Sequence, residues 1–427
     1  MTPNLRRITI GLVLFAALVA IAAPALGAGE AIKGRLIAVS PEGREPVAGV
    51  SMIVSQDASE IGTGVSDEDG NWVVTVPSAG VYQVALDQGT LPDGVALTDP
   101  DADELPNVVV KEGQPTTVIF RLGPGASSAV SNFGRVGSLI ILGLKLGAII
   151  ALCAIGLSLV FAVTGLVNFA HGELVTLGAV LAFYFHGTPA GPQWPLAVAA
   201  VPAVALGGLF GWVQDKVIWK PLRDRRVSAL AMMVVSIGLA FALRNLILIV
   251  FDGLPRAYPD WAGQPAINML GIQIVPKHLF AIAVAVVVLV GVALFLQRTR
   301  AGTALRAVSD NKDLAESSGI DVNQIIAITW VLSGTLAALG GIIFALTETV
   351  QWDMGFKLLL LIFAAVVLGG LGTAYGAIVG SFIVGLTVEL STLVFPNELK
   401  AGVGLLLLIV MLLVRPQGIL GTKDRIG

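Results

Sequence analysis

A few ionisable and polar side chains interrupt the long apolar runs of this sequence, and these are the residues there that could do chemistry. Asn168, His171 and Glu173 lie together between two apolar runs. Irregular backbone at membrane depth persists only where it is buried or lines a watery cavity, and transporters place broken helices along their translocation paths. We therefore expect one helix to end near Thr164 and another to begin near Gly172, with Asn168, His171 and Glu173 as translocation-path candidates.

Each of these side chains also has a purely structural interpretation. His171 and Glu173 would simply cap a helix at the membrane interface, where Glu173 suits the positive end of the helix dipole. Asn168 would satisfy backbone groups that the break leaves free, and we favour that role for it.

Three more ionisable residues, Lys145, Arg244 and Glu389, lie inside apolar runs. Long Lys and Arg side chains can extend from a helix end to the membrane interface, so we favour structural roles for Lys145 and Arg244. Glu389 has no partner that the sequence can assign, and it is kept as a path candidate.

A second break is rich in glycine, with Gly369, Gly370 and Gly372 between two apolar segments. Glycine in membrane helices usually allows close packing. We expect these three glycines to shape a narrow passage along the path without binding solute specifically.

Catalytic chemistry has no support in this sequence. There is no G-x-x-x-x-G-K-[ST] motif and no Gly-Lys pair, so ATP would have to be bound by partner subunits and no cofactor is expected in this chain. The three histidines stand at different segment ends, which supports neither a metal site nor a catalytic triad; they are His171, His186 and His278.

The composition points to lipid as the solvent for most of the chain. Of 427 residues, 55% are hydrophobic and 13% are charged, about half the charged fraction of soluble domains. We expect an all-α polytopic membrane domain of about 8–9 helices, some broken or re-entrant, because about 20 residues span the hydrocarbon core. The apolar segments are 138–163, 169–186, 196–214, 229–251, 277–297, 323–346, 358–371, 374–395 and 401–414.

The first 137 residues differ from this pattern. Arg6 and Arg7, an apolar run and small residues ending at Ala28 indicate a signal peptide over 1–28, with an uncleaved signal anchor as the alternative. Residues 29–125 are acidic and show short alternating strands at 34–39, 50–54, 72–76, 81–86 and 117–120, which predict a small all-β sandwich. Residues 126–137 form a Gly/Ser-containing linker.

Two motifs in this sandwich carry a family resemblance. The segments 46–50 (Pro-Val-Ala-Gly-Val) and 66–72 (Ser-Asp-Glu-Asp-Gly-Asn-Trp) resemble carboxypeptidase-regulatory-like or transthyretin-like domains. Asp67, Asp69 and Asn71 look like the start of a calcium loop, but the remaining ligands are missing, so a hairpin turn is the better interpretation.

Charge asymmetry sets the expected orientation. Basic residues gather in 216–226, 298–312 and 415–425, which the positive-inside rule places in the cytoplasm. With nine spans and an exported front domain, all three segments do fall inside. We expect a multi-pass protein of the bacterial cytoplasmic (inner) membrane, with an extracytoplasmic N-terminal domain and a cytoplasmic tail, 422–427.

The loop 298–321 has helical periodicity and a glycine stop at Gly319, which suits a short helix that docks a soluble partner. This loop, the two breaks and the terminal segment 415–421 resemble the branched-chain amino acid permease family of ABC importers, over residues 138–421. The resemblance implies cytoplasmic ATPase subunits, an extracytoplasmic solute-binding protein and a second permease or a second copy of the chain. It also implies that an ATPase-coupling segment contains Arg306, Ala315, Glu316, Gly319 and Ile320.

By this resemblance the solute is a branched-chain or related small amino acid, with urea or short amides as the alternative. Two other classes of function stay open: an ATP-independent channel or secondary transporter, and a receptor whose sandwich binds ligand. Membrane lipid is an expected partner, whereas the dispersed basic residues give no nucleic-acid footprint.

Overall fold

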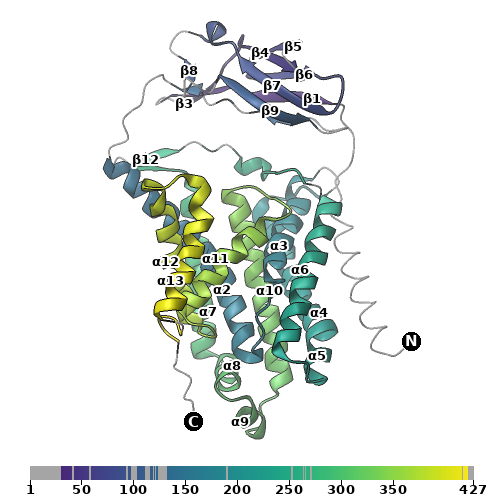
Figure 1. Cartoon of the computed structure of the whole chain (residues 1–427), viewed down its shortest axis with the longest axis vertical. Helices are drawn as coiled ribbons and strands as arrows, with labels where there is room; N and C mark the ends of the chain where they lie inside the picture. Colours follow the sequence, from purple (N-terminus) through teal and green to yellow (C-terminus); the bar gives the residue numbers. More distant parts are fainter. Residues whose placement is uncertain are drawn as a thin grey trace, which may run out of the picture. The chain divides into compact units, whose positions relative to one another are not determined.

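The chain divides into two compact units, one within Ala25–Ser131 and one within Asn132–Gly427 (Figure 1). We call their described parts the β unit and the helical unit. The computed structural model describes residues 30–40, 43–56, 59–92, 95–97, 103–110, 116–118, 120, 122–123, 132–188, 191–251, 253–262, 264, 266–269, 272–415 and 417–421. The signal peptide expected at 1–28 and the tail 422–427 lie outside these residues.

The β unit contains three small sheets around one hydrophobic core. Their strand orders are β10-β1-β6, β3-β2-β11-β8 and β5-β4-β7-β9. The strands are β1 (Ala31–Arg35), β2 (Ile37–Ser40), β3 (Gly43–Pro46), β4 (Ser51–Gln56), β5 (Ser59–Val65), β6 (Asn71–Thr75), β7 (Gly80–Leu86), β8 (Ala96–Leu97), β9 (Glu104–Val110), β10 (Thr116–Val118) and β11 (Leu122–Gly123).

Alternation explains these strands. In β6, Trp72 and Val74 are buried, whereas Val73 between them is exposed. The all-β prediction for the front of the chain is therefore confirmed. Five strands were not predicted: the short strands β3, β8 and β11, and the longer β5 and β9. Glycines in β5 and a proline in β9 obscure the period-two pattern.

The turn before β6 joins β5 and β6, which lie in different sheets and do not pair with each other, so the expected hairpin is wrong. Asp67 Oδ1 accepts hydrogen bonds from the backbone N–H groups of Asp69, at 3.0 Å, and Asn71, at 2.7 Å. Gly70 has φ +78°, which favours glycine. The carboxylate of Asp67 is thus used in the turn, and the interpretation of this segment as a turn is confirmed.

The helical unit consists of nine long apolar helices with shorter elements between them (Figure 1). The long helices are α2 (Asn132–Thr164), α3 (His171–Gly187), α4 (Leu196–Gln214), α6 (Ala229–Phe251), α7 (Pro276–Arg298), α10 (Val322–Thr347), α11 (Met354–Gly369), α12 (Ala374–Leu390) and α13 (Lys400–Val414). The shorter elements are η2 (Asp215–Trp219), α5 (Lys220–Asp224), η3 (Pro259–Trp261), β12 (Ile267–Met269), β13 (Ile272–Ile274), α8 (Arg300–Asp310), α9 (Lys312–Ser317), η4 (Ser391–Leu393) and η5 (Asn397–Leu399).

Each predicted apolar segment corresponds to one of the nine long helices. Six helices among the described residues are long and apolar enough to cross a membrane, and the remaining three, α3, α11 and α13, have 17, 16 and 15 residues. The predicted count of 8–9 spans is thus larger than the number that length and composition support. Helix α2 begins at Asn132, within the expected linker 126–137, and at 33 residues it is about 50 Å long.

Helices α2 and α10 form the centre of the helical unit. In the apolar 18-residue stretch of each helix, 89% of the residues are buried in α2 and 72% in α10, against 28% in α7. Glycines bring the neighbouring helices close: a Cβ on Gly334 of α10 would lie 2.3 Å from the carbonyl oxygen of Gly207 in α4.

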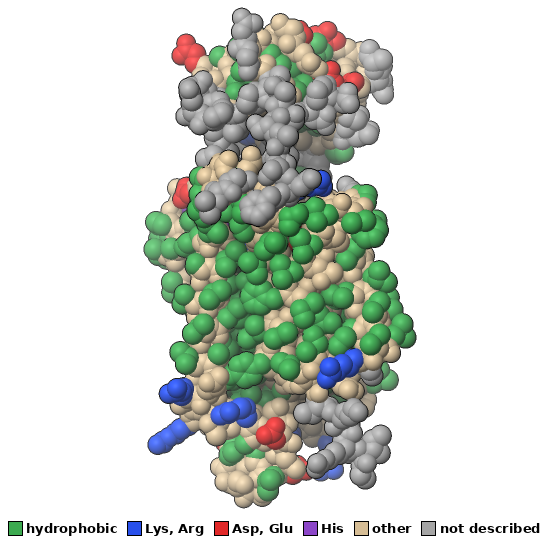
Figure 2. Space-filling view, turned by 90° about the vertical axis from the view of Figure 1, so that its left-hand side faces the viewer, with side chains coloured by type: hydrophobic (Ala, Val, Ile, Leu, Met, Phe, Trp, Pro, Cys, Tyr) green, Lys and Arg blue, Asp and Glu red, His purple; other side chains and the backbone are tan. Residues whose placement is uncertain are grey.

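The surface of the helical unit has a broad apolar belt. Figure 2 shows hydrophobic side chains over its middle and Lys and Arg side chains at the end that carries α8 and α9. This distribution fits a helical unit that lies in a bilayer with a basic face at one end.

Candidate functional site

The break between α2 and α3 lies where the sequence places it. Helix α2 ends at Thr164, Gly165 has φ +67°, and α3 begins at His171, with Glu173 in its first turn. Asn168 is 1% exposed, and its Oδ1 accepts a hydrogen bond of 3.1 Å from the backbone N–H of Ala170. Asn168 therefore does satisfy the broken backbone, but its Nδ2 has no hydrogen-bond partner among the described residues.

His171 is fully buried beside α2. Its Nε2 lies 2.9 Å from the carbonyl oxygen of Cys153, and its Nδ1 has no partner among the described residues. A hydrogen bond to that carbonyl requires a proton on Nε2, which leaves Nδ1 of a neutral ring as an acceptor. His171 thus fixes α3 to α2 and still presents one free nitrogen.

Glu173 faces Arg244 of α6 inside the helical unit. Arg244 Nε lies 3.7 Å from Glu173 Oε1, and both side chains are buried. Neither carboxylate oxygen of Glu173 nor Nε of Arg244 has a hydrogen-bond partner among the described residues. Two opposite charges therefore lie close together without the hydrogen bonds that usually accompany a buried ion pair.

The guanidinium of Arg244 packs between two aromatic rings. It lies 3.9 Å from the ring centroid of Phe356 in α11 and 4.8 Å from that of Phe241 in its own helix. Cation–π contacts of this kind hold an Arg head group without using its N–H donors. The extension of Arg244 to the interface that we considered from sequence is wrong, because the side chain turns inward and is only 9% exposed.

The other intramembrane charges form separate pairs. Lys145 Nζ donates to Glu348 Oε1 at 2.8 Å, and Lys400 Nζ donates to Glu389 Oε2 at 2.8 Å. Lys145 is 4% exposed, whereas the side chain of its partner Glu348, directly after the end of α10, is 51% exposed. Among the described residues, neither pair shares a hydrogen bond or ion pair with the Glu173–Arg244 pair.

Gly369, Gly370 and Gly372 have backbone roles at the α11–α12 break. A Cβ on Gly369 would lie 1.9 Å from the carbonyl oxygen of Gly376, and Gly370 and Gly372 have φ of +110° and +81°. The terminal segment packs on this break, where Ile419 and Leu420 donate backbone hydrogen bonds to Leu368 and Gly369. Close packing is thus the role that these contacts assign to the glycines.

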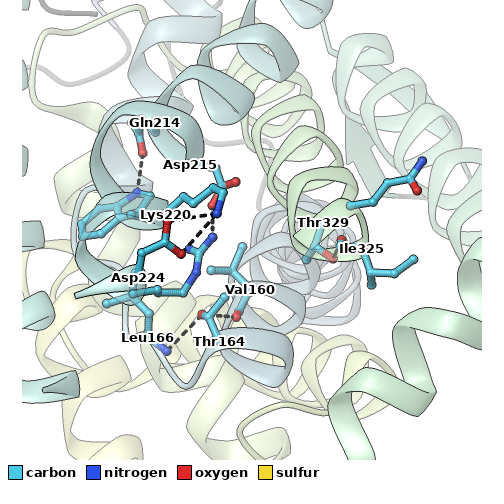
Figure 3. A network of polar contacts seen from close by, with 12 residues as sticks. Val160, Thr164, Leu166, Gln214, Asp215, Lys220, Asp224, Ile325 and Thr329 are labelled. Atoms are coloured by element: carbon cyan, nitrogen blue, oxygen red, sulfur yellow. Dashed lines mark hydrogen bonds and ion pairs between the residues drawn. The ribbon is translucent and has the colours of Figure 1, made fainter. Parts of the chain in front are cut away.

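A polar cluster that sequence reasoning missed lies at the end of α4 (Figure 3). Residues Asp215–Trp219 form one π-helical turn, and Arg223 donates to the fully buried Asp215 at 2.6 Å. Trp219 stacks on Trp330 of α10, with ring centroids 5.7 Å apart. Single π-helical turns are frequent at functional sites. The sign of this cluster in the sequence is a single acidic residue, Asp215, between the apolar run 196–214 and the basic segment 216–226.

The expected coupling segment forms two short helices before α10. Arg306, Glu316 and Gly319 are exposed, whereas Ala315 is buried and Ile320 is half-buried. Gly319 has φ +85°, and no atom lies within 4 Å of the place where its Cβ would be. A surface groove runs beside them, lined by Arg298, Thr299, Arg300, Thr303, Ala304, Ala307 and Ile320.

Metal binding has no support among the described residues. No set of three His, Cys, Asp or Glu side chains there could hold a metal ion. The break between α2 and α3 is buried, and Glu173 beside it faces the opposite charge of Arg244. The basic end of the helical unit carries the groove and the exposed helix pair α8–α9.

Comparison with known proteins assigns this architecture. Residues 139–414 match the family described as branched-chain amino acid transport system / permease component. The chain belongs to this permease family. The match covers the helical unit and leaves the β unit outside it, so the resemblance that the sequence motifs indicated for the membrane part is confirmed.

Individual relatives agree with this assignment. The chain is 31% identical to the high-affinity branched-chain amino acid transport system permease protein BraD of Pseudomonas aeruginosa, over 66% of this chain and 94% of BraD. It is 30% identical to LivH of Escherichia coli over the same fractions. The ribose import permease protein RbsC of Escherichia coli is 29% identical, over 55% of this chain and 72% of RbsC.

Proposed function

We propose that this chain is the membrane-spanning permease subunit of an ABC importer for branched-chain or related small amino acids, driven by separate ATPase subunits. The observation that carries the proposal is the family match over nearly all of the helical unit. The names of BraD and LivH, which specify branched-chain amino acids, support the solute class.

Coupling to the ATPase subunits is assigned to α8 and α9. Leu314 is 64% exposed on this pair, which also carries the groove beside Ile320. An exposed pair of short helices with a groove on a basic face suits docking of a protein partner. We place this face in the cytoplasm and the β unit on the extracytoplasmic side. The other expected partners of the helical unit are an extracytoplasmic solute-binding protein and a second permease or a second copy of this chain.

The translocation path runs past the α2–α3 break in this proposal. Asn168, His171 and Glu173 line it because each presents a buried polar atom without a partner among the described residues. Gly369, Gly370 and Gly372 shape it through backbone packing. Glu389 is the weaker candidate, since Lys400 already accounts for its charge.

Affinity purification of the tagged protein from its native membranes tests the coupling. We expect an ATPase subunit to copurify, and Leu314→Asp to reduce its recovery. The matched control is Val73→Asp, which changes a comparably exposed aliphatic side chain (61%) in the β unit and leaves recovery unchanged.

Uptake by liposomes that contain the purified complex and its binding protein tests the solute. We expect ATP-dependent uptake of L-leucine. ATP-dependent uptake of urea or acetamide instead would assign the alternative solutes. Solute flux without ATP, with no ATPase recovered, would contradict the importer and favour a channel or secondary transporter.

A further inference from the structure

The Glu173–Arg244 pair differs from the other Lys and Arg ion pairs that have a buried member in the described helical unit. Arg223–Asp215, Lys145–Glu348 and Lys400–Glu389 have N···O distances of 2.6 to 2.8 Å, whereas Arg244–Glu173 is at 3.7 Å. A charge buried without hydrogen bonds is costly, so proteins rarely retain one without a use for it. A ligand with complementary charged groups would satisfy the atoms that lack hydrogen bonds here.

The unpartnered atoms form two opposite sets. Glu173 offers two carboxylate oxygens as acceptors, whereas Arg244 Nε and Asn168 Nδ2 offer donors. An ammonium group has only donors and a carboxylate only acceptors. A solute that carries both groups on one carbon would pair with Glu173 and Arg244 at once.

The surroundings favour a solute without net charge. Asp353 is within electrostatic reach of Glu173, but Lys357 pairs with it at 2.9 Å, which leaves the site close to neutral. Phe241 and Phe356 flank the guanidinium, and Phe169 and Phe363 are in ring contact at 4.8 Å beside the same break. These aromatic surfaces suit an aliphatic side chain.

From these contacts we infer that Glu173 and Arg244 recognise the head group of a zwitterionic solute, with Glu173 binding the ammonium and Arg244 the carboxylate. The inference rests on the proposed importer function and adds the chemistry by which the path selects its solute. In this conformation the pair is enclosed, because Gly172 of α3 and Gly355 of α11 are in backbone contact beside it.

The decisive variant is the double substitution Glu173→Gln/Arg244→Gln. Gln at both positions removes the two charges together and leaves no buried charge without its partner, so a purely structural pair predicts near-normal transport. Recognition of the head group predicts a fall of at least about tenfold in ATP-dependent L-leucine uptake by liposomes, since two charge-assisted contacts are lost. The control is the double variant Lys145→Gln/Glu348→Gln, which removes a pair that has one buried member, and its uptake stays within about twofold of the wild type.

Two further readouts separate recognition from assembly. Copurification of the ATPase and ATP hydrolysis stimulated by the binding protein should persist in the Glu173→Gln/Arg244→Gln variant. Uptake within twofold of the wild type, or loss of uptake together with loss of assembly, would overturn the inference and leave the pair a structural one. Failure of the wild type to take up L-leucine would instead contradict the proposed function, and the two failures are therefore distinguishable.

Discussion

At the scale of single residues, the contact between Gly172 and Gly355 determines how closely α3 and α11 approach. A Cβ on Gly355 would lie 1.8 Å from the carbonyl oxygen of Gly172, which is backbone and cannot rotate away. We expect Gly355→Ala to separate the helices and destabilise the protein by about 1–3 kcal/mol. Thermal unfolding of the purified protein measures this. Gly238→Ala in α6, with no atom within 4 Å, is the matched control and should leave stability unchanged or slightly raised; equal effects at both positions would contradict the packing argument.

At the scale of elements, the short helix α9 depends on its N-cap. Asn311 Oδ1 accepts a 2.9 Å hydrogen bond from the backbone N–H of Leu314, and a six-residue helix has little other local stability. Asn311→Ala should weaken α9 by about 1 kcal/mol and reduce solute-stimulated ATP hydrolysis roughly fivefold. Asn311→Ser retains a cap and should retain most of the rate. If Ala and Ser give the same rate in liposomes, the order of α9 does not limit coupling.

At the scale of the whole molecule, the two units have separate hydrophobic cores. The β unit closes around residues such as Ile32, Val50 and Tyr82, and the helical unit around α2 and α10. Deletion of residues 31–122 should therefore leave membrane insertion, assembly with the ATPase and L-leucine uptake within about twofold of the full chain. Lost uptake in a deletion variant that still assembles would show that the β unit acts as an essential receptor.

Local patterns in the sequence determined the elements. Hydropathy alone located the apolar helices, the polar break before His171 and the glycine break at Gly369–Gly372, because segment boundaries depend on neighbouring residues. The alternating strands β1, β2, β4, β6, β7 and β10 followed for the same reason, whereas Gly62, Gly64 and Pro106 interrupt the alternation in β5 and β9.

Only the tertiary structure decided which charges meet. Glu173 and Arg244 are 71 positions apart, and the sequence favoured an Arg244 that extends toward the interface. The partners of Lys145 and Glu389, and the π-helical turn that buries Asp215, were equally hidden. Hydropathy measures how apolar a segment of the sequence is. Ion pairing depends instead on the rotation and packing of helices from distant parts of the chain, which no local sequence pattern contains.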